Sequence, residues 1–176
     1  MPDVRIGVPP AIDQQGNTVI WFVGGTIADK AAVKAATELG AATSYDVTYS
    51  FLTDGFPLDS TQEKTTDDRL TLMNTLEALG KVAVNFGDGI RYVDSTLAGS
   101  AAVVLKPVAP STSISGFFVV RTGVDYNVLA AAGQKGTVYP VTLGVPRRGP
   151  IDGSGKFTWK QQVVLTGLPV ETTFAA

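Results

Sequence analysis

The segment Tyr45-Asp46-Val47-Thr48-Tyr49-Ser50-Phe51 alternates apolar and polar side chains with a period of two. Successive side chains of an extended strand point to opposite faces, so the apolar residues would share one face and the polar residues the other. This pattern is typical of a strand that buries one face. It therefore predicts a β-strand over residues 45–51.

The same alternation recurs along the chain between segments rich in turn residues. It predicts further strands at Thr18–Val23, Leu70–Leu76, Val82–Phe86, Ala101–Lys106, Gly116–Arg121, Thr137–Leu143 and Phe157–Thr166. Many short strands with few helical segments favour a β-sandwich or partial barrel over alternating strand–helix units. The predicted fold class is therefore all-β.

Two segments depart from the strand pattern. Residues 29–39 predict one flanking α-helix, because Asp29 suits an N-cap, Gly40 suits a C-cap, and the apolar residues between them recur at helical spacing. Residues 125–132 predict a shorter helical turn that begins at Asp125 and ends before Gly133. Both segments are expected to pack against a sheet as connectors.

The chain has 176 residues, which favours a single domain over residues 1–176. Within it, residues 1–27 are expected to form an N-terminal arm and the first strand. Residues 53–66 are expected to form an extended inter-strand loop, because the segment is rich in Gly, Pro, Ser and Thr and is longer than a hairpin connection requires.

The residue types that the chain lacks restrict its chemistry. It contains no histidine and no cysteine, which excludes a Ser-His-Asp triad, thiol catalysis and iron–sulfur ligation. We expect no enzymatic activity, no catalytic or metal-binding residues and no cofactor. The formal net charge of −2 argues against a general nucleic-acid-binding surface. The N-terminus lacks a signal-peptide pattern and no apolar run reaches membrane-spanning length, so we expect no membrane binding.

Charge is distributed unevenly along this nearly neutral chain. Residues 46–68 contain six acids and one base, whereas residues 135–160 contain five bases and one acid. This asymmetry is the most informative electrostatic feature of the chain. For Arg147 and Arg148, a salt bridge within the loop or a contact between subunits is favoured over phosphate binding. The candidate interface residues are the acids and apolar anchors of the long loop, and bases of the later segment: Asp54, Phe56, Leu58, Asp59, Arg147, Arg148 and Lys156.

Other motifs have simpler interpretations. The glycine-rich segments 87–89 and 152–155 lack phosphate-loop or calcium-loop spacing and predict turns. Trp21 and Trp159 are expected in the core, although an exposed pair would favour a sugar-binding platform. A Ser–Lys dyad formed by Ser111 and Lys106 is a minor alternative.

The order of several segments resembles the major tail tube proteins of long, non-contractile bacteriophage tails, particularly of phages that infect actinobacteria. The segments lie between residues 28 and 167, and they are AATELGAATSYDVTYSFLTDGF, TTDDRLTLMNTLEALGKV, GIRYVD, GFFVVRTGVDYNVLAAAGQKGTVYPVTLGVPRRGP and WKQQVVLTG. The most specific part is VYPVTLGVPRR, residues 138–148.

This resemblance implies a β-sandwich with a flanking helix, six copies in a ring, and rings stacked into a hollow tube. The genome would pass through the channel into the host without specific DNA binding. The implied partners are further copies of the chain, a tape-measure protein, a tail terminator, and tail tip or baseplate proteins. The implied location is the virion tail, after assembly in the host cytoplasm.

Two placements follow as hypotheses. Residues 53–66 would order against the adjacent ring, where their acids would meet the bases around Arg147, Arg148 and Lys156. The polar face of Asp46, Thr48 and Ser50 would line the channel, because DNA slides past an acidic and polar wall more readily than past a basic groove. The alternatives are another β-rich virion protein, such as a capsid decoration or fibre-like protein, and a module that binds carbohydrate or the host surface.

Overall fold

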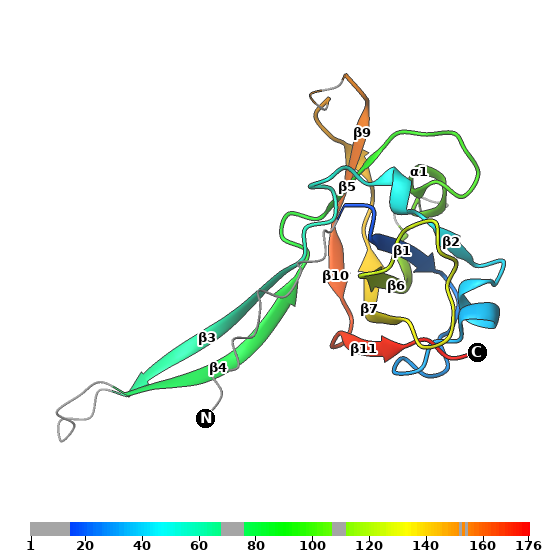
Figure 1. Ribbon diagram of the computed structural model, residues 1–176. Coiled ribbons are helices and arrows are strands. Elements are labelled where there is room, and N and C mark those ends of the chain that lie inside the picture. Colours follow the sequence, from blue (N-terminus) through cyan, green and yellow to red (C-terminus); the bar gives the residue numbers. More distant parts are fainter. Residues whose placement is uncertain (1–14, 68–75, 107–111, 152, 154) are drawn as a thin grey trace, which may run out of the picture.

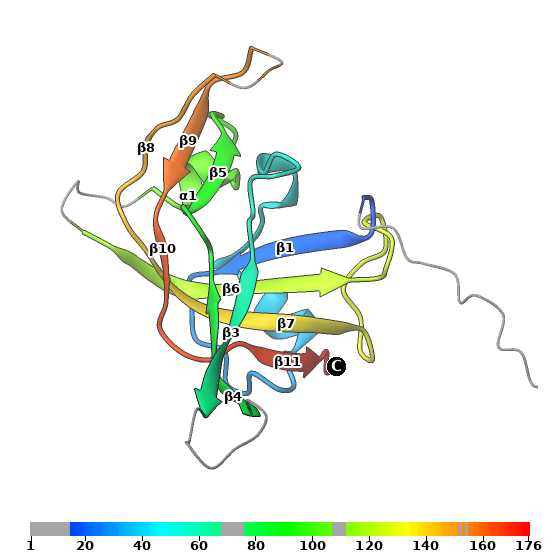
Figure 2. The ribbon, with the colours of Figure 1, turned by 90° about the vertical axis from the view of Figure 1, so that its left-hand side faces the viewer.

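The computed structural model describes residues 15–67, 76–106, 112–151, 153 and 155–176. Its largest unit is an antiparallel six-stranded sheet in the order β10-β7-β6-β1-β2, with β11 also paired to β7 (Figure 2). These strands are β1 (Thr18–Val23), β2 (Ser44–Asp46), β6 (Ile114–Thr122), β7 (Lys135–Leu143), β10 (Val163–Leu165) and β11 (Val170–Thr173). The prediction of an all-β fold is confirmed.

The register of the central strands separates the core into two layers. Phe22 pairs with Phe118, and Phe118 pairs with Tyr139, so these rings lie on one face of the sheet. Residues one position earlier or later, such as Trp21 and Val119, point to the other face. Because both faces are covered, β1 is buried along most of its length, which its run of apolar residues reflects.

The first core layer lies between the sheet and a second group of elements. These are α1 (Ala101–Val104) and a three-stranded sheet of β5 (Ile90–Val93), β9 (Thr158–Gln161) and β8 (Arg147–Arg148). Gln161 is 1% exposed and joins this group together. Its amide donates to the carbonyls of Leu105 and Gly144, and its oxygen accepts from the Tyr92 hydroxyl.

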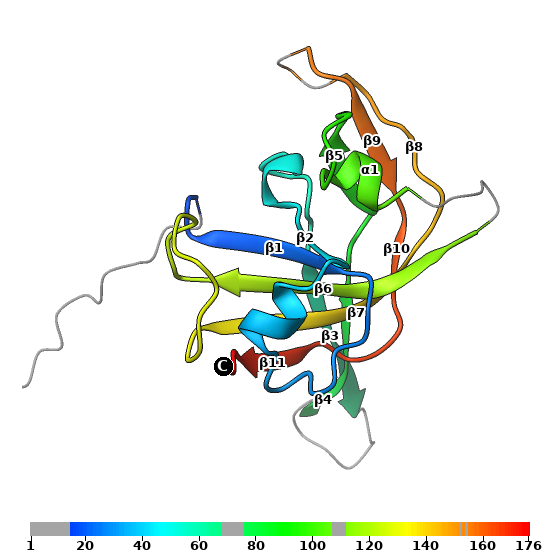
Figure 3. The ribbon, with the colours of Figure 1, turned by 90° about the vertical axis from the view of Figure 1, so that its right-hand side faces the viewer.

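The second core layer is covered by residues 27–39 and by the C-terminus (Figure 3). Val33 and Phe174 are buried in this layer, and Trp21 meets Phe174 edge to face. The predicted helix over residues 29–39 is correct only in its last part, where Ala35–Leu39 forms one π-helical turn. The earlier part is held in turns because the Glu38 carboxylate accepts from the Ala28 and Lys34 amides.

A long hairpin of β3 (Asp59–Asp67) and β4 (Leu76–Asn85) extends away from this body (Figure 1). The prediction of an extended loop over residues 53–66 is therefore wrong in its second half, where Asp59 onward is a strand. This strand could not be predicted from its composition, because a strand that is exposed on both faces shows no alternation of apolar and polar residues. The predicted strand Leu70–Leu76 lies mostly outside the described residues, and so do residues 1–14 of the predicted arm.

Four other predicted elements differ from the structure. The strand over residues 45–51 ends at Asp46 and is followed by the 3-10 turn Thr48–Ser50, because the Thr48 hydroxyl takes the place of a backbone acceptor for the Ile20 amide. Residues 101–104 form α1 instead of a strand. Residues 125–132 form turns instead of a helix. The strand expected over residues 157–166 is two strands, β9 and β10, with a break at Gln162.

Candidate functional site

The β3–β4 hairpin is exposed on both faces. Every described side chain of β3 from Asp59 to Thr66 is exposed, and neither strand has a partner on its outer edge among the described residues. An unpaired strand edge presents backbone N–H and C=O groups that can pair with another chain. The hairpin therefore has the properties of an element that is completed by assembly.

A bulge brings two exposed apolar side chains of β4 onto one face of this hairpin, beside Gln62 and Lys64 of β3. Gln62 pairs with Val82 and Lys64 with Leu79, so two residues of β4 lie opposite Glu63. Paired residues share a face, and the extra residue therefore returns Leu79 to the face that carries Val82. Leu79 is 73% exposed and Val82 is 58% exposed. Sequence alternation missed this face, because Leu79 and Val82 are three positions apart.

The base of the hairpin is attached to its own subunit. Phe56 packs edge to face against Phe86 and Phe118 within the first core layer. Asp54 forms an ion pair with Arg91, and the hydrogen bond from Arg91 lowers the pKa of the Asp54 carboxyl. Of the candidate loop residues, Phe56 and Asp54 therefore have partners within the subunit, whereas Leu58 and Asp59 are exposed.

Arg148 lies in a compact cluster with Asp94 and Trp159. Its guanidinium is 2.7 Å from the Asp94 carboxylate and stacks 4.4 Å from the centre of the Trp159 ring. The Trp159 indole also donates to Asp94, at 2.8 Å. The hydrogen bond from Trp159 is the largest cause of a lowered pKa of the Asp94 carboxyl, and the hydrogen bond from Arg148 lowers this pKa further. Arg148 therefore has a partner within the subunit, while Arg147 is exposed on β8.

The structure distributes the remaining candidate residues between two hollows. Asp46, Ser50 and Lys156 line one hollow of about 580 Å³, although the sequence assigned them to two different surfaces. Thr48 lines another. The polar face expected for Asp46, Thr48 and Ser50 does not exist as a strand face, because the Thr48 hydroxyl donates to Asp46 and the Ser50 hydroxyl accepts from the Ala101 amide.

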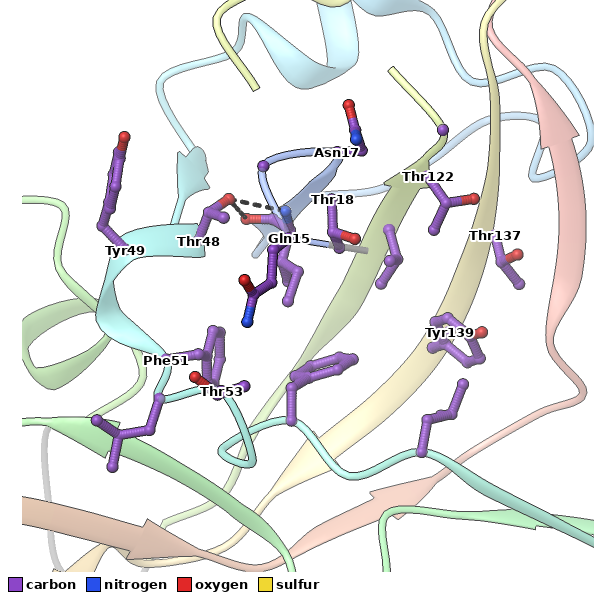
Figure 4. Close-up of a pocket in the computed structure, with 17 residues that line it drawn as sticks. Gln15, Asn17, Thr18, Thr48, Tyr49, Phe51, Thr53, Thr122, Thr137 and Tyr139 are labelled. Atoms are coloured by element: carbon purple, nitrogen blue, oxygen red, sulfur yellow. Dashed lines mark hydrogen bonds between the residues drawn. The ribbon is translucent and has the colours of Figure 1, made fainter. Parts of the chain in front are cut away.

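The hollow lined by Thr48 is a groove of about 850 Å³ on the face of β1, β6 and β7 (Figure 4). Ile20, Val120 and Phe51 supply apolar surface. Thr18, Thr48, Thr53, Thr122 and Thr137 supply hydroxyl groups around it. This groove could not be predicted from the sequence, because its walls come from segments far apart in the chain.

A second surface that the sequence did not indicate is the loop after β6. Arg121 is fully buried, and its guanidinium donates to the carbonyls of Asp125 and Val128 and to the side chain of Gln134. Burial lowers the pKa of this guanidinium. The loop that it holds presents Leu129, which is 86% exposed.

The described part of the chain contains neither a metal-binding cluster nor a membrane-spanning helix. Within residues 15–67, 76–106 and 112–151 and the described C-terminal part, no group of three or more acidic side chains could hold a metal ion. The helices described there include none long and apolar enough to cross a membrane. Trp21 is buried and Trp159 is covered by Arg148, so the two tryptophans form no exposed pair.

An all-β subunit with an exposed hairpin, whose outer edges have no partner within the described part of the chain, has the architecture of a structural protein that assembles with other chains. The family model described as phage tail tube protein matches residues 8–176, and the chain belongs to this family. Its location is accordingly the tail of the virion. No curated protein and no solved structure is detectably similar to the chain.

Proposed function

We propose that this protein is the structural, non-catalytic subunit of a phage tail tube, with six copies in each ring and rings stacked around a channel for the genome. The family supports assembly with other copies and with tail proteins in general. The single observation in the fold that carries the proposal is the β3–β4 hairpin, whose outer edges have no partner among the described residues and which exposes Leu79 and Val82 on one face. Pairing of such edges between neighbours would close sheets around a channel.

The stacking of rings would use a second interface. A ring closes through one heterologous interface, and a tube needs another that does not close. We propose that Asp59 and Glu63, beside the exposed Leu58, meet Arg147 and Lys156 of the next ring, because the four charged residues are exposed and their charges are opposite. Asp54 and Arg148 would contribute less, since each already has an ion-pair partner in its own subunit.

The channel wall would include Asp46, which is exposed, beside Thr48 and Ser50. An acidic and polar wall would repel the DNA backbone and would let the genome pass without binding. A tape-measure protein, a terminator and a tip complex would be the other partners. A phage of the non-contractile, actinobacterial type is the source that the sequence motifs favour.

The hairpin face provides the test. The double variant Leu79→Asp/Val82→Asp places charges on the apolar face, whereas the control Leu79→Ile/Val82→Ile keeps it apolar and suited to a strand. We expect electron microscopy to show tubes for the wild type and the control, but only unassembled subunits for the aspartate variant. The melting temperature of the subunit should stay unchanged, because both side chains are exposed. Normal tubes from the aspartate variant would contradict the proposed role of the hairpin.

A further inference from the structure

The groove of Figure 4 is the uncovered end of the first core layer. Phe118 and Tyr139 pair across β6 and β7 in a row that residues 47–56 and α1 cover. The next row along these strands includes Ile20 and Val120, which pair across β1 and β6 and line the groove. The core therefore continues along the sheet beyond the described segment that covers it.

The groove has room for several apolar side chains. Its volume of about 850 Å³ is within the range of about 300–1,000 Å³ that is typical of ligand sites. Ile20 and Tyr139 are 6% and 7% exposed and form its floor together with Phe51. An apolar occupant would bind there favourably, because the contact removes apolar surface of both partners from water. The groove therefore fits a short apolar segment of polypeptide.

The described chain begins in the wall of this groove. Gln15 lines it, and its side chain projects toward the middle of the groove (Figure 4). Two backbone hydrogen bonds fix the position of this end of the chain. The Tyr126 amide donates to the Gly16 carbonyl at 2.7 Å, and the Gly123 amide donates to the Asn17 carbonyl at 2.9 Å. The residues that precede Gln15 are therefore attached at the groove itself.

The segment before Gln15 lies outside the described residues, and its sequence suits the groove. Residues 4–12 contain one charged residue, Arg5, and four β-branched apolar residues, Val4, Ile6, Val8 and Ile12. A chain spans up to about 3.3 Å per residue, so the tether to Gln15 lets Ile6 reach any point within about 30 Å, which includes the whole groove. We infer that residues 4–12 bind in the groove of their own subunit and cover the open end of the first core layer.

The attachment at Gln15 favours the same subunit over a second copy. A ligand joined to its site by a short linker meets that site at an effective concentration on the order of millimolar. A segment from a free second copy meets the same site only at the protein concentration, which in a micromolar solution is roughly a thousandfold lower. The contact therefore forms within a single subunit, and it does not rest on the proposed function.

This contact gives the subunit a covered core before it meets any other copy. The floor of the groove no longer faces water, so the groove does not compete with the β3–β4 hairpin for apolar surfaces of neighbouring subunits. The groove is then a docking site inside the subunit, and the hairpin remains the surface for other copies.

Crosslinking of the full-length, unassembled subunit tests this inference, because the chain has no native cysteine. The variant Ile6→Cys/Thr122→Cys places one thiol on the segment and one on the exposed wall of the groove. The control Ile6→Cys/Val128→Cys has its second thiol outside the groove, two residues from Tyr126, whose amide donates to Gly16. In dilute solution, a short bismaleimide should crosslink the Thr122 variant within single chains at least ten times faster than the control.

The crosslinked product distinguishes the possible occupants of the groove. Monomers with an internal crosslink, formed at a rate that does not depend on protein concentration, are the expected result. Covalent dimers in place of that product would show that a second copy fills the groove. Equal rates for the two variants would show that the linker alone brings the thiols together. Either of these two results would overturn the inference.

A second pair of variants measures the same contact through the stability of the unassembled subunit. Ile6→Ser/Val8→Ser removes apolar side chains from the segment and should lower the melting temperature by about 3 °C or more. The control Asp3→Ser/Arg5→Ser changes two charged positions of the same segment, and its melting temperature should stay within a degree of the wild type. An unchanged melting temperature of the Ile6/Val8 variant would overturn the inference, whether or not the wild-type protein forms tubes.

Discussion

At the scale of single residues, Gln161 connects three parts of the fold through Tyr92, Leu105 and Gly144. It is buried at the meeting point of β5, β9 and the segment after α1, and its amide group satisfies two carbonyls and one hydroxyl. Burial also raises the pKa of Tyr92, whose hydroxyl donates to Gln161. Polar groups in such a position are costly to leave without partners.

We expect Gln161→Leu to lower the free energy of unfolding by about 2–4 kcal/mol, because Leu105, Gly144 and Tyr92 would keep buried polar atoms without hydrogen bonds. The control is Gln162→Leu, because the Gln162 side chain is exposed and donates to the Asp88 carbonyl at the surface. Urea denaturation of both variants measures the difference. Equal stability of the two variants would contradict the role given to Gln161.

The sequence predicted residues correctly where burial alone decides their position. Trp21 is in the core as expected, and its neighbours on β1 are buried with it. The partners of charged residues could not be predicted, because Arg148 meets Asp94 and Arg91 meets Asp54 across more than thirty positions of sequence. The uneven distribution of charge could be read from the sequence. Which of those charges form ion pairs within the subunit could not.

At the scale of elements, strands inside the main sheet were predicted best. β1, β6 and β7 agree with prediction to within two residues at each end, because they are rich in β-branched and aromatic residues and pair with each other along their length. Elements fixed by a side chain from elsewhere were predicted wrongly. Thr48 ends β2 by bonding to Ile20, and Arg121 keeps residues 125–132 from forming a helix by taking their carbonyls.

The loop after β6 yields a prediction at this scale. Arg121→Met should free the Asp125 and Val128 carbonyls, and hydrogen exchange at the amides of Asn127 and Ala131 should rise about tenfold, equivalent to about 1.4 kcal/mol of local stability. Lys135→Met is the control, because Lys135 is exposed and outside this network. Unchanged exchange in the Arg121 variant would show that the loop holds its shape without the buried guanidinium.

At the scale of the whole molecule, the subunit has a packed core at its centre and exposed apolar surface at its periphery. The main sheet buries both faces, whereas no other described residue covers the hairpin edges or the exposed Leu79 and Val82. Exposed apolar surface of this kind marks interaction sites in proteins that assemble. Membership in the phage tail tube family supplies the same conclusion independently of the geometry.

The central claim is that these uncovered surfaces close six copies into a ring and stack the rings into a hollow tube. Electron microscopy of the purified wild-type protein, concentrated stepwise, tests that claim most directly. We predict hollow tubes or six-fold rings with an open channel. Closed trimers, or particles without a channel, would contradict the account and would favour a capsid decoration protein instead.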